Sequence, residues 1–174
     1  MRQGRHGVPD ELGSLLLQVC FLPPAEARAI WDAELAHRLS IADLPTESHG
    51  VLPLLHQRLV ELDRRASDMA RMQGVRRRLW VQNEIRLRAV GAAVDHLGAR
   101  GVPVALLGGL AGLVGHLGRS DLRPLHDADL LVSAEDAPAA CQALEREGWE
   151  VGVPWRGGFL LDLQGVRCTD PRGQ

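Results

Sequence analysis

The hydrophobic pattern of this chain changes its period once, at Gly101, and that change limits the folds that the chain can adopt. From Pro9 to about Arg100, apolar residues recur at the three- and four-residue steps of amphipathic helices. After Gly101, short apolar runs of strand length alternate with helical segments and glycine turns. We therefore expect an α/β (α+β) fold, with a small mixed sheet and a helical N-terminal extension.

Prolines and a polar run divide the upstream region into predicted helices. The breaks fall at Pro23 and Pro24, at Pro45, and at the polar residues 64–68. The third helix should cover residues 48–64, and the longest, residues 75–99, should pack its apolar side against the sheet. The predicted core residues along these helices are Leu12, Leu15, Leu16 and Val19, then Ile30, Trp31 and Leu35, then Leu55, Leu59 and Leu62, and finally Leu79, Leu87, Val90, Val94 and Leu97.

The downstream region alternates between strands and helices. Ser133 should cap one of the helices and Gly148 should end it. Strands are predicted over residues 102–107, 127–132, 149–153 and 159–163, and helices over residues 110–117 and 134–147. We place a helical region in residues 1–74 and an α/β core, short at its C-terminal end, in residues 75–174.

Composition limits the partners of such a fold. The chain has no lysine, so phosphate groups would have to be bound by backbone amides, arginine or a metal ion. A net charge of −2 gives no general attraction for polyanions, and we do not expect nucleic acid as a partner. Three widely separated cysteines fit a reducing cytoplasm, and neither a signal peptide nor an apolar run of membrane-spanning length is apparent.

Asp127 and Asp129 are the best candidates for metal ligands. They flank Ala128 at the start of a predicted strand, and because side chains alternate along a strand, both carboxylates should project from one face. Paired carboxylates suit Mg²⁺ or Mn²⁺, the ions that phosphoryl-transfer sites use. A solvated strand end is the alternative interpretation of this short pattern.

Two further features could complete a phosphate site. Gly108 and Gly109 end one strand and open a helix, where backbone N–H groups can bind phosphate, although a simple tight turn favours glycine equally. Asp162 is an acidic residue inside an apolar run, where burial would be costly unless the carboxylate is paired or metal-bound. Alternatively, Asp162 faces water on an edge strand.

The order of these motifs resembles the polymerase β-type nucleotidyltransferase superfamily. The glycine turn L-G-G-L-A from Leu107, the segment L-R-P-L-H-D-A-D-L-L-V from Leu122, and the helix that ends in E-G-W at Trp149 follow its pattern. Within it, the chain is most similar to a bacterial nucleotidyltransferase family with a glycine turn, an R-P-x-x-D-x-D-L-L-V strand and a later D-L-H strand. The resemblance covers roughly residues 75–163.

The resemblance implies a magnesium-dependent enzyme that moves a nucleoside monophosphate from a nucleoside triphosphate such as ATP to a hydroxyl-bearing acceptor. Asp127 and Asp129 would bind Mg²⁺ (or Mn²⁺), and Asp162 would be the third carboxylate. Gly108 and Gly109 would hold the nucleotide phosphates, and Arg123 would support the site or the triphosphate. The acceptor could be a small molecule, a peptide or a protein.

Departures from the family pattern favour an alternative, a noncatalytic or partner-dependent relative that binds or regulates. Gly108 stands where relatives often carry lysine, and Gln164 replaces the usual histidine. The chain ends at Gln174, soon after Asp162, so a second copy or a partner chain would have to complete the site. A third interpretation is a helical interaction protein whose D-x-D motif is a solvated strand end.

Other polar and aromatic residues have simpler interpretations. His126 should be a partly exposed histidine at a strand start, and His116 a partner of a helix C-terminus. No cysteine has an evident base nearby that would make it a nucleophile. The arginines of the long helix, Arg76, Arg77, Arg78, Arg86 and Arg88, should form a solvated face, and Trp31, Trp80, Trp149 and Trp155 should be core or interface residues.

Overall fold

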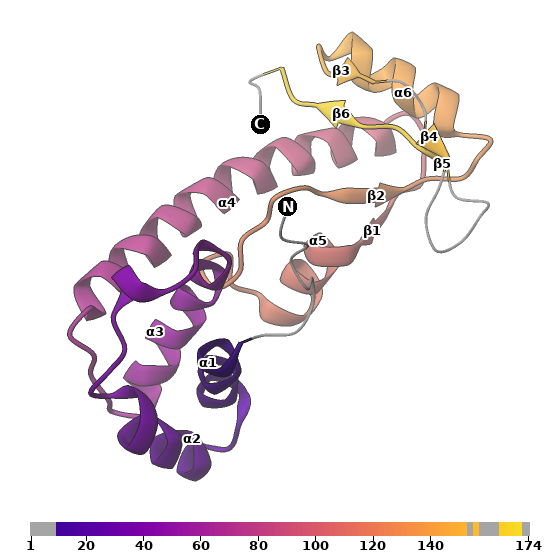
Figure 1. Ribbon diagram of the computed structural model, residues 1–174. Coiled ribbons are helices and arrows are strands. Elements are labelled where there is room, and N and C mark those ends of the chain that lie inside the picture. The colour runs from indigo at the N-terminus through magenta and orange to yellow at the C-terminus, as the bar shows by residue number, and fades with distance from the viewer. Residues whose placement is uncertain (1–9, 153–154, 157–163, 172–174) are drawn as a thin grey trace, which may run out of the picture. The chain divides into compact units, whose positions relative to one another are not determined.

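The computed structural model describes residues 10–152, 155–156 and 164–171, and its helices and short antiparallel strands confirm the α+β fold class (Figure 1). The chain divides into two compact units: Met1–Gln82 with Arg119–Pro124, and Asn83–Gly118 with Leu125–Gln174. This division and the predicted boundary between residues 74 and 75 both fall within helix α4 (Met69–Gly98). The two units are described separately below.

Helices make up the first unit over its described residues. Asp10 caps the first helix, because its carboxylate accepts a 2.7 Å hydrogen bond from the Gly13 amide. Pro24 opens the second helix, where its fixed φ suits the first turn. The elements are α1 (Glu11–Phe21), α2 (Pro24–Ile30), the π-helical turn η1 (Trp31–Leu35), the 3-10 helices η2 (Ile41–Asp43) and η3 (Thr46–Val51), α3 (Leu52–Glu61) and the first part of α4.

Two helix boundaries differ from the sequence prediction. The helix expected over residues 48–64 begins as the 3-10 helix η3 and becomes α-helical only at Leu52, next to Pro53, which lacks an N–H for the helical hydrogen bonds. Helix α4 begins at Met69 instead of residue 75. Met72 is fully buried, so tertiary packing supports helix upstream of Gly74, a residue that disfavours helix on propensity alone.

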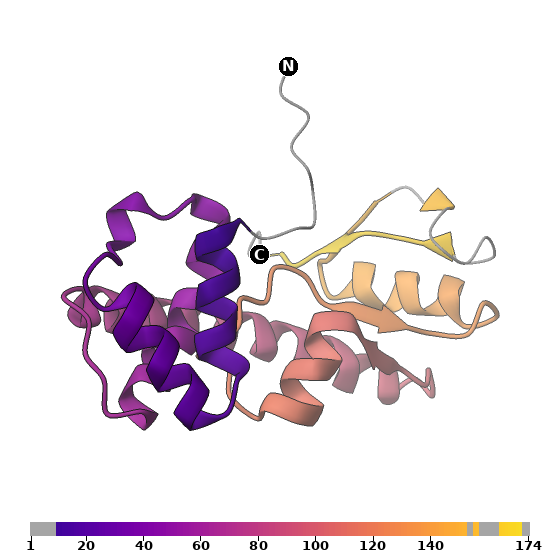
Figure 2. The same ribbon diagram turned by 60° about the horizontal axis from the view of Figure 1, so that its bottom comes forward.

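The core of the first unit lies among these helices. Helix α1 packs against both α2 and α3 (Figures 1 and 2). Trp31, predicted to be a core residue, is 1% exposed. The fully buried side chains that surround this core are Leu16, Val19, Leu35, Leu52, Leu55, Leu59, Leu62 and Met72. Burying each such leucine contributes about 1.5–3 kcal/mol, so this layer stabilises the helices that contain it.

Arg58 of α3 holds the end of α1. Its Nε and Nη2 donate hydrogen bonds to the backbone carbonyls of Val19 and Leu22, at 3.3 and 2.5 Å. These carbonyls belong to the last turn of α1 and the residue after it, where the helix offers no N–H partner of its own. The guanidinium therefore supplies the donors that the end of α1 lacks.

A polar cluster of Arg76, Arg119 and Asp121 holds the segment Arg119–Pro124 in the first unit. Arg76 of α4 and Arg119 both donate hydrogen bonds to the Asp121 carboxylate, at 2.6 and 2.9 Å. Burial raises the pKa of Asp121, but the hydrogen bonds from Arg119 and Arg76 and their charges outweigh it and hold the pKa below its ordinary value. Arg76 also lies 3.3 Å from Nδ1 of the buried His56.

The second unit contains the strands and the rest of α4. Its described elements are β1 (Ala105–Leu107), α5 (Gly108–Gly112), the π-helical turn η4 (Leu113–Leu117), β2 (Asp129–Leu131), α6 (Ala137–Arg146), β3 (Glu150–Val151), β4 (Trp155–Arg156), β5 (Gln164–Gly165) and β6 (Cys168–Thr169). Antiparallel pairs join β1 to β2, β3 to β6, and β4 to β5. The strand predicted over residues 159–163 lies outside the described residues.

The core of the second unit joins α4 to α6. Ala93 and Leu97 of α4 pack with Val102 and with Ala143 and Leu144 of α6. Val104 and Val132, which adjoin β1 and β2, and the strand residues Val151 and Cys168 pack against this cluster. The long helix therefore packs against the strand region, as predicted, through Leu97 of the predicted stripe and through Ala93, which the stripe did not include. Trp149 lies half-buried against the same cluster, as expected of a core residue.

The ends of α6 follow the sequence signals with one shift. Ser133 Oγ accepts a 3.0 Å hydrogen bond from the Asp136 amide, but the intervening residues form a turn, and α6 begins only at Ala137. At the other end, Gly148 has a φ of +84°, and the Trp149 amide donates to the Leu144 carbonyl. Among the described residues, no helix is both long and apolar enough to cross a membrane.

The His56 environment predicts a pH dependence of stability. Burial, followed by the charge of Arg76, lowers the pKa of His56 in the folded chain. Unfolded chains therefore bind the His56 proton first as the pH falls through about 6.5, and the free energy of unfolding decreases below that pH. Urea unfolding at pH 7.5 and 5.5 should show this loss in wild type and a smaller loss in His56→Gln. The exposed His116→Gln control should behave as wild type, and an unchanged loss in His56→Gln would contradict the assignment.

Candidate functional site

Gly108 and Asp129 lie next to each other at one end of the β1–β2 pair. In the antiparallel register, Leu107 is opposite Asp129, and Gly108 follows as the first residue of α5. Gly108 has a φ of +55°, and a Cβ atom at this position would lie 2.8 Å from Oδ2 of Asp129. The left-handed backbone conformation therefore favours glycine here, and a Cβ atom would also require the exposed Asp129 side chain to move.

Helix α4 fixes the chain just upstream of the acidic residues. The buried Asn83 side chain accepts a 3.1 Å hydrogen bond from the Leu125 amide, and Arg86 donates a 2.7 Å hydrogen bond to the Leu125 carbonyl. Leu125 itself is 2% exposed, so its peptide groups need protein partners. Two side chains one helical turn apart thus hold the backbone that leads into Asp127 and Asp129.

The two aspartates have different backbone settings. Asp129 is the first residue of β2, whereas Asp127 precedes it in a segment without regular secondary structure, so the strand is shorter than the predicted range of residues 127–132. Both side chains are exposed. We predicted that alternation along a strand would place both carboxylates on one face. Because only Asp129 lies in the strand, this reasoning does not fix the direction of the Asp127 side chain.

The other predicted site residues lie in different parts of the chain. Gly109 is half-buried in the first turn of α5, next to Gly108. Arg123 is exposed and belongs to the segment Arg119–Pro124 of the first unit. Asp162, the predicted third carboxylate, lies outside the described residues. His126 is exposed, and His116 is exposed in the last turn of η4, as expected of a partner of a helix C-terminus.

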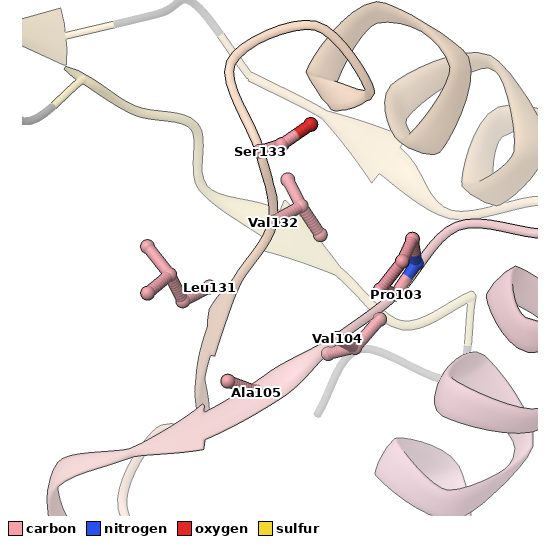
Figure 3. Close-up of a pocket in the computed structure, with 6 residues that line it drawn as sticks. All are labelled: Pro103, Val104, Ala105, Leu131, Val132 and Ser133. Atoms are coloured by element: carbon pink, nitrogen blue, oxygen red, sulfur yellow. The ribbon is translucent and has the colours of Figure 1, made fainter.

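The opposite end of the β1–β2 pair carries a shallow pocket of about 350 Å³, beyond the Ala105–Leu131 pairing (Figure 3). Leu131 and Val132 leave their strand in opposite directions, Leu131 being 42% exposed while Val132 packs toward the core (Figure 3). Pro103, Val104 and Ser133 complete the lining with Ala105. Within the described part of the chain, no charged side chain lines this pocket, and the charged side chain of the pair's own strands is Asp129 at the other end.

The donor chemistry of Asp127 and Asp129 suits a divalent cation. Their carboxylate oxygens are hard ligands of the kind that Mg²⁺ prefers, and the missing Cβ of Gly108 leaves space beside Oδ2 of Asp129. Among the described residues, no group of three or more His, Cys, Asp or Glu side chains could hold a metal ion. Two carboxylates fit Mg²⁺ nevertheless, because this ion commonly takes its other ligands from water and substrate phosphates.

The cysteines are poor nucleophiles, in agreement with the sequence analysis. Burial raises the pKa of Cys20 to about 12, although the charge of Arg58 acts in the opposite direction. Burial also raises the pKa of Cys141 and Cys168, with smaller contributions from neighbouring acidic groups. Thiols with raised pKa values hold little reactive thiolate near neutral pH.

Sequence reasoning missed Asn83 and misjudged Arg86, which was expected on a solvated face. The signal was present in the apolar stripe of α4. Leu79 and Leu87 are separated by eight residues, and Asn83 occupies the intermediate position on the same side of the helix. A polar residue at a core position requires a hydrogen-bond partner, and here that partner is the Leu125 amide.

An acidic strand that meets a glycine turn across an antiparallel pair is the arrangement expected of a nucleotidyltransferase. The family model described as an uncharacterised nucleotidyltransferase matches residues 46–159, more than half of the chain, and the chain belongs to this family. The match starts upstream of residue 75, where the sequence resemblance began, and so includes helix α3. No match was found among curated proteins or among solved structures.

The hydrogen bond between Asn83 and Leu125 can be tested by removing its acceptor. Asn83→Leu keeps a side chain of similar size but leaves the buried Leu125 amide unpaired, and should lower the free energy of unfolding by about 1–3 kcal/mol. Arg78→Ala, at an exposed position of the same helix, should change it by less than about 0.5 kcal/mol. Urea denaturation provides the comparison, and equal stabilities of the two variants would argue against the assigned role.

Three glycine-to-alanine variants test the left-handed backbone conformation at Gly108. Gly101→Ala, with a φ of +74° and open space around it, should lower the free energy of unfolding by about 1–2 kcal/mol through the backbone conformation alone. Gly108→Ala, with a φ of +55°, should lower it by a similar or larger amount, because its Cβ also requires the exposed Asp129 side chain to move. Gly74→Ala, in helix α4 with nothing near its Cβ position, should gain about 0.5–1 kcal/mol. Thermal unfolding should place Gly74→Ala above wild type and both Gly101→Ala and Gly108→Ala below it, whereas an unchanged stability of Gly108→Ala would contradict the left-handed conformation assigned to Gly108.

Proposed function

We propose that the protein is a magnesium-dependent nucleotidyltransferase that transfers a nucleoside monophosphate from a nucleoside triphosphate to a hydroxyl-bearing acceptor. The observation that supports this proposal is the approach of Gly108 to the Asp129 carboxylate, because it unites the predicted phosphate-binding turn with a predicted metal ligand. Membership of a nucleotidyltransferase family supports the reaction type.

Each residue of the proposed site has a distinct role. Asp127 and Asp129 hold the cation with their carboxylates, and Asp129 is positioned for this by its pairing with Leu107. Backbone N–H groups at Gly108 and Gly109 face the phosphates at the start of α5, where they require no lysine. Mg²⁺ held by Asp127 and Asp129 would supply positive charge that offsets the negative charge developing on the phosphates during transfer. The resemblance adds Asp162 as the carboxylate that helps to deprotonate the acceptor hydroxyl, and Arg123 as support for the triphosphate.

In the proposed mechanism, the protein contributes to catalysis by holding the residues of the site in position before the substrate binds. Phosphoryl transfer depends mainly on alignment of the attacking and leaving oxygens and on stabilisation of charge. Asn83 and Arg86 hold the Leu125 backbone, and Gly108 fixes the space beside Asp129. The chain thereby places the start of the acidic strand before any substrate binds, which avoids reorganisation during the reaction.

A noncatalytic or partner-dependent relative is the second candidate. Over the described residues, the carboxylates of the site number two, and Gln164 of β5 stands where the family pattern has histidine. A protein of this kind would bind Mg²⁺ and nucleotide yet require a second chain to add the missing groups. Binding is therefore common to both candidates, and turnover by the isolated chain separates them.

Calorimetric titration of each of the nucleoside triphosphates, with and without Mg²⁺, tests the proposed site. Wild type should bind at least one nucleotide in a Mg²⁺-dependent manner, and Asp127→Ala with Asp129→Ala should abolish that binding because it removes both carboxylate ligands. Asp95→Ala, an exposed aspartate of α4 in the same unit, should leave it unchanged.

Two outcomes would redirect the proposal. A folded wild-type chain that binds no Mg²⁺–nucleotide complex would exclude a stand-alone nucleotidyltransferase. Mg²⁺-dependent binding without release of pyrophosphate, across small-molecule, peptide and protein acceptors, would support the partner-dependent relative. Circular dichroism of each variant identifies losses that are caused by unfolding.

A further inference from the structure

The first unit contains a polar pocket that the proposed reaction does not use. It has a volume of about 410 Å³ and is lined by His56, Gln73, Arg76, Arg77, Trp80 and Asp121. All of these residues belong to the first unit, whereas Asp127, Asp129 and Gly108 belong to the second. The lining of the pocket therefore comes from the first unit and shares no residue with the proposed reaction site.

Trp80 has an unusual setting for a tryptophan. The sequence analysis expected it in the core or an interface, but the structure leaves it 49% exposed, so that prediction is wrong for the core. Leu79, its neighbour on α4, takes the buried position of that turn with 7% exposure. The large indole ring thus lies partly open to solvent at the rim of a pocket, where a planar ligand can stack on it.

An exposed arginine lies on the same face of α4 as Trp80. Arg77 is exposed and lies one turn before Trp80, and Gln73 lies one turn before Arg77, so the three side chains share a helix face. The part of α4 that belongs to the first unit, up to Gln82, carries four arginines and no acidic residue. Arg77 is thus placed to attract an anion next to the indole ring.

Hydrogen bonds hold three of the residues that line the pocket, His56, Arg76 and Asp121. Asp121 is held by Arg76 and Arg119, and Arg76 also faces Nδ1 of His56. A guanidinium can only donate, so Nδ1 accepts and the proton of the neutral ring resides on Nε2. With burial and Arg76 lowering the pKa of His56, the ring is neutral at pH 7, and the cluster of three arginines and one aspartate keeps a net positive charge.

We propose that this pocket binds a nucleoside phosphate, with its base stacked on Trp80 and its phosphate bound by Arg77. An exposed aromatic ring beside arginine is the combination that recognises a base and its phosphate without reading sequence. A bare phosphate would not use the indole ring, and an apolar ligand would not use the charges. The ligand can come from two sources, a free nucleotide or a segment of single-stranded RNA, which share this chemistry.

The site can be tested apart from the proposed reaction. The full chain carrying Asp127→Ala and Asp129→Ala is titrated in EDTA with AMP and with single-stranded oligoadenylate, using calorimetry and tryptophan fluorescence. Binding should persist without metal, with quenching of Trp80 fluorescence, and should weaken as salt increases. The result is independent of Mg²⁺–nucleotide binding by the wild-type chain, so the two proposals fail separately.

Variants in the same background assign the contacts. Trp80→Ala and Arg77→Ala should each weaken binding about tenfold, the order expected for one stacked base or one charged contact. Trp80→Phe should retain most of the affinity while losing the fluorescence change. Arg78→Ala is the matched control, since Arg78 is the next arginine on α4, is exposed and does not line the pocket.

The outcomes are decisive in either direction. AMP binding that depends on Trp80 and Arg77 identifies a free nucleotide as a sufficient ligand. Binding of oligoadenylate alone, with the same dependence, identifies single-stranded RNA. The proposal is overturned if neither probe binds, or if Arg78→Ala weakens binding as much as Arg77→Ala, because the interaction would then be general attraction to a basic helix.

Discussion

The rest of the candidate site depends on the hydrogen bonds that helix α4 makes to the backbone of Leu125. A buried peptide group must find partners within the protein, and Asn83 and Arg86 satisfy both its amide and its carbonyl. Both side chains come from helix α4, so they fix the position of the backbone four residues before β2 begins. The position of Asp129 opposite Leu107, and its contact with Gly108, follow from that position.

The contact between Gly108 and Asp129 explains why a sheet of such short strands can present a defined site. A ladder of three residue pairs fixes few side chains. Its end is fixed further by a left-handed glycine that permits the chain to turn directly into α5 while a carboxylate lies beside it. In the proposed reaction, substrate phosphates and a cation would meet at this end, whereas the described residues that line the pocket at the far end carry no charge.

Arginine performs several different tasks in a chain without lysine. Arg58 and Arg86 donate to backbone carbonyls, Arg76 forms an ion pair with Asp121, and Arg77 remains exposed at a pocket. The planar guanidinium has donors in a fixed geometry, so one side chain can hold several acceptors at once. The arginines of α4 therefore include side chains that hold the fold together and one that is exposed at a pocket, a difference that composition does not reveal.

The sequence by itself determined the fold class, the glycine turn, the acidic strand and the termination of α6 at Gly148, because these depend on local periodicity and backbone preference. It located Asp127 and Asp129 but not the residues that position them. Asn83 and Leu125 are 42 residues apart, and Arg86 and Leu125 are 39 apart, so local patterns carry no record of their pairing. The exposure of Trp80 was likewise not predictable from the sequence, since helical spacing permits both a buried and an exposed indole at that position. Only the tertiary structure decided these cases, because burial and hydrogen bonding of a side chain depend on which distant segments pack against it.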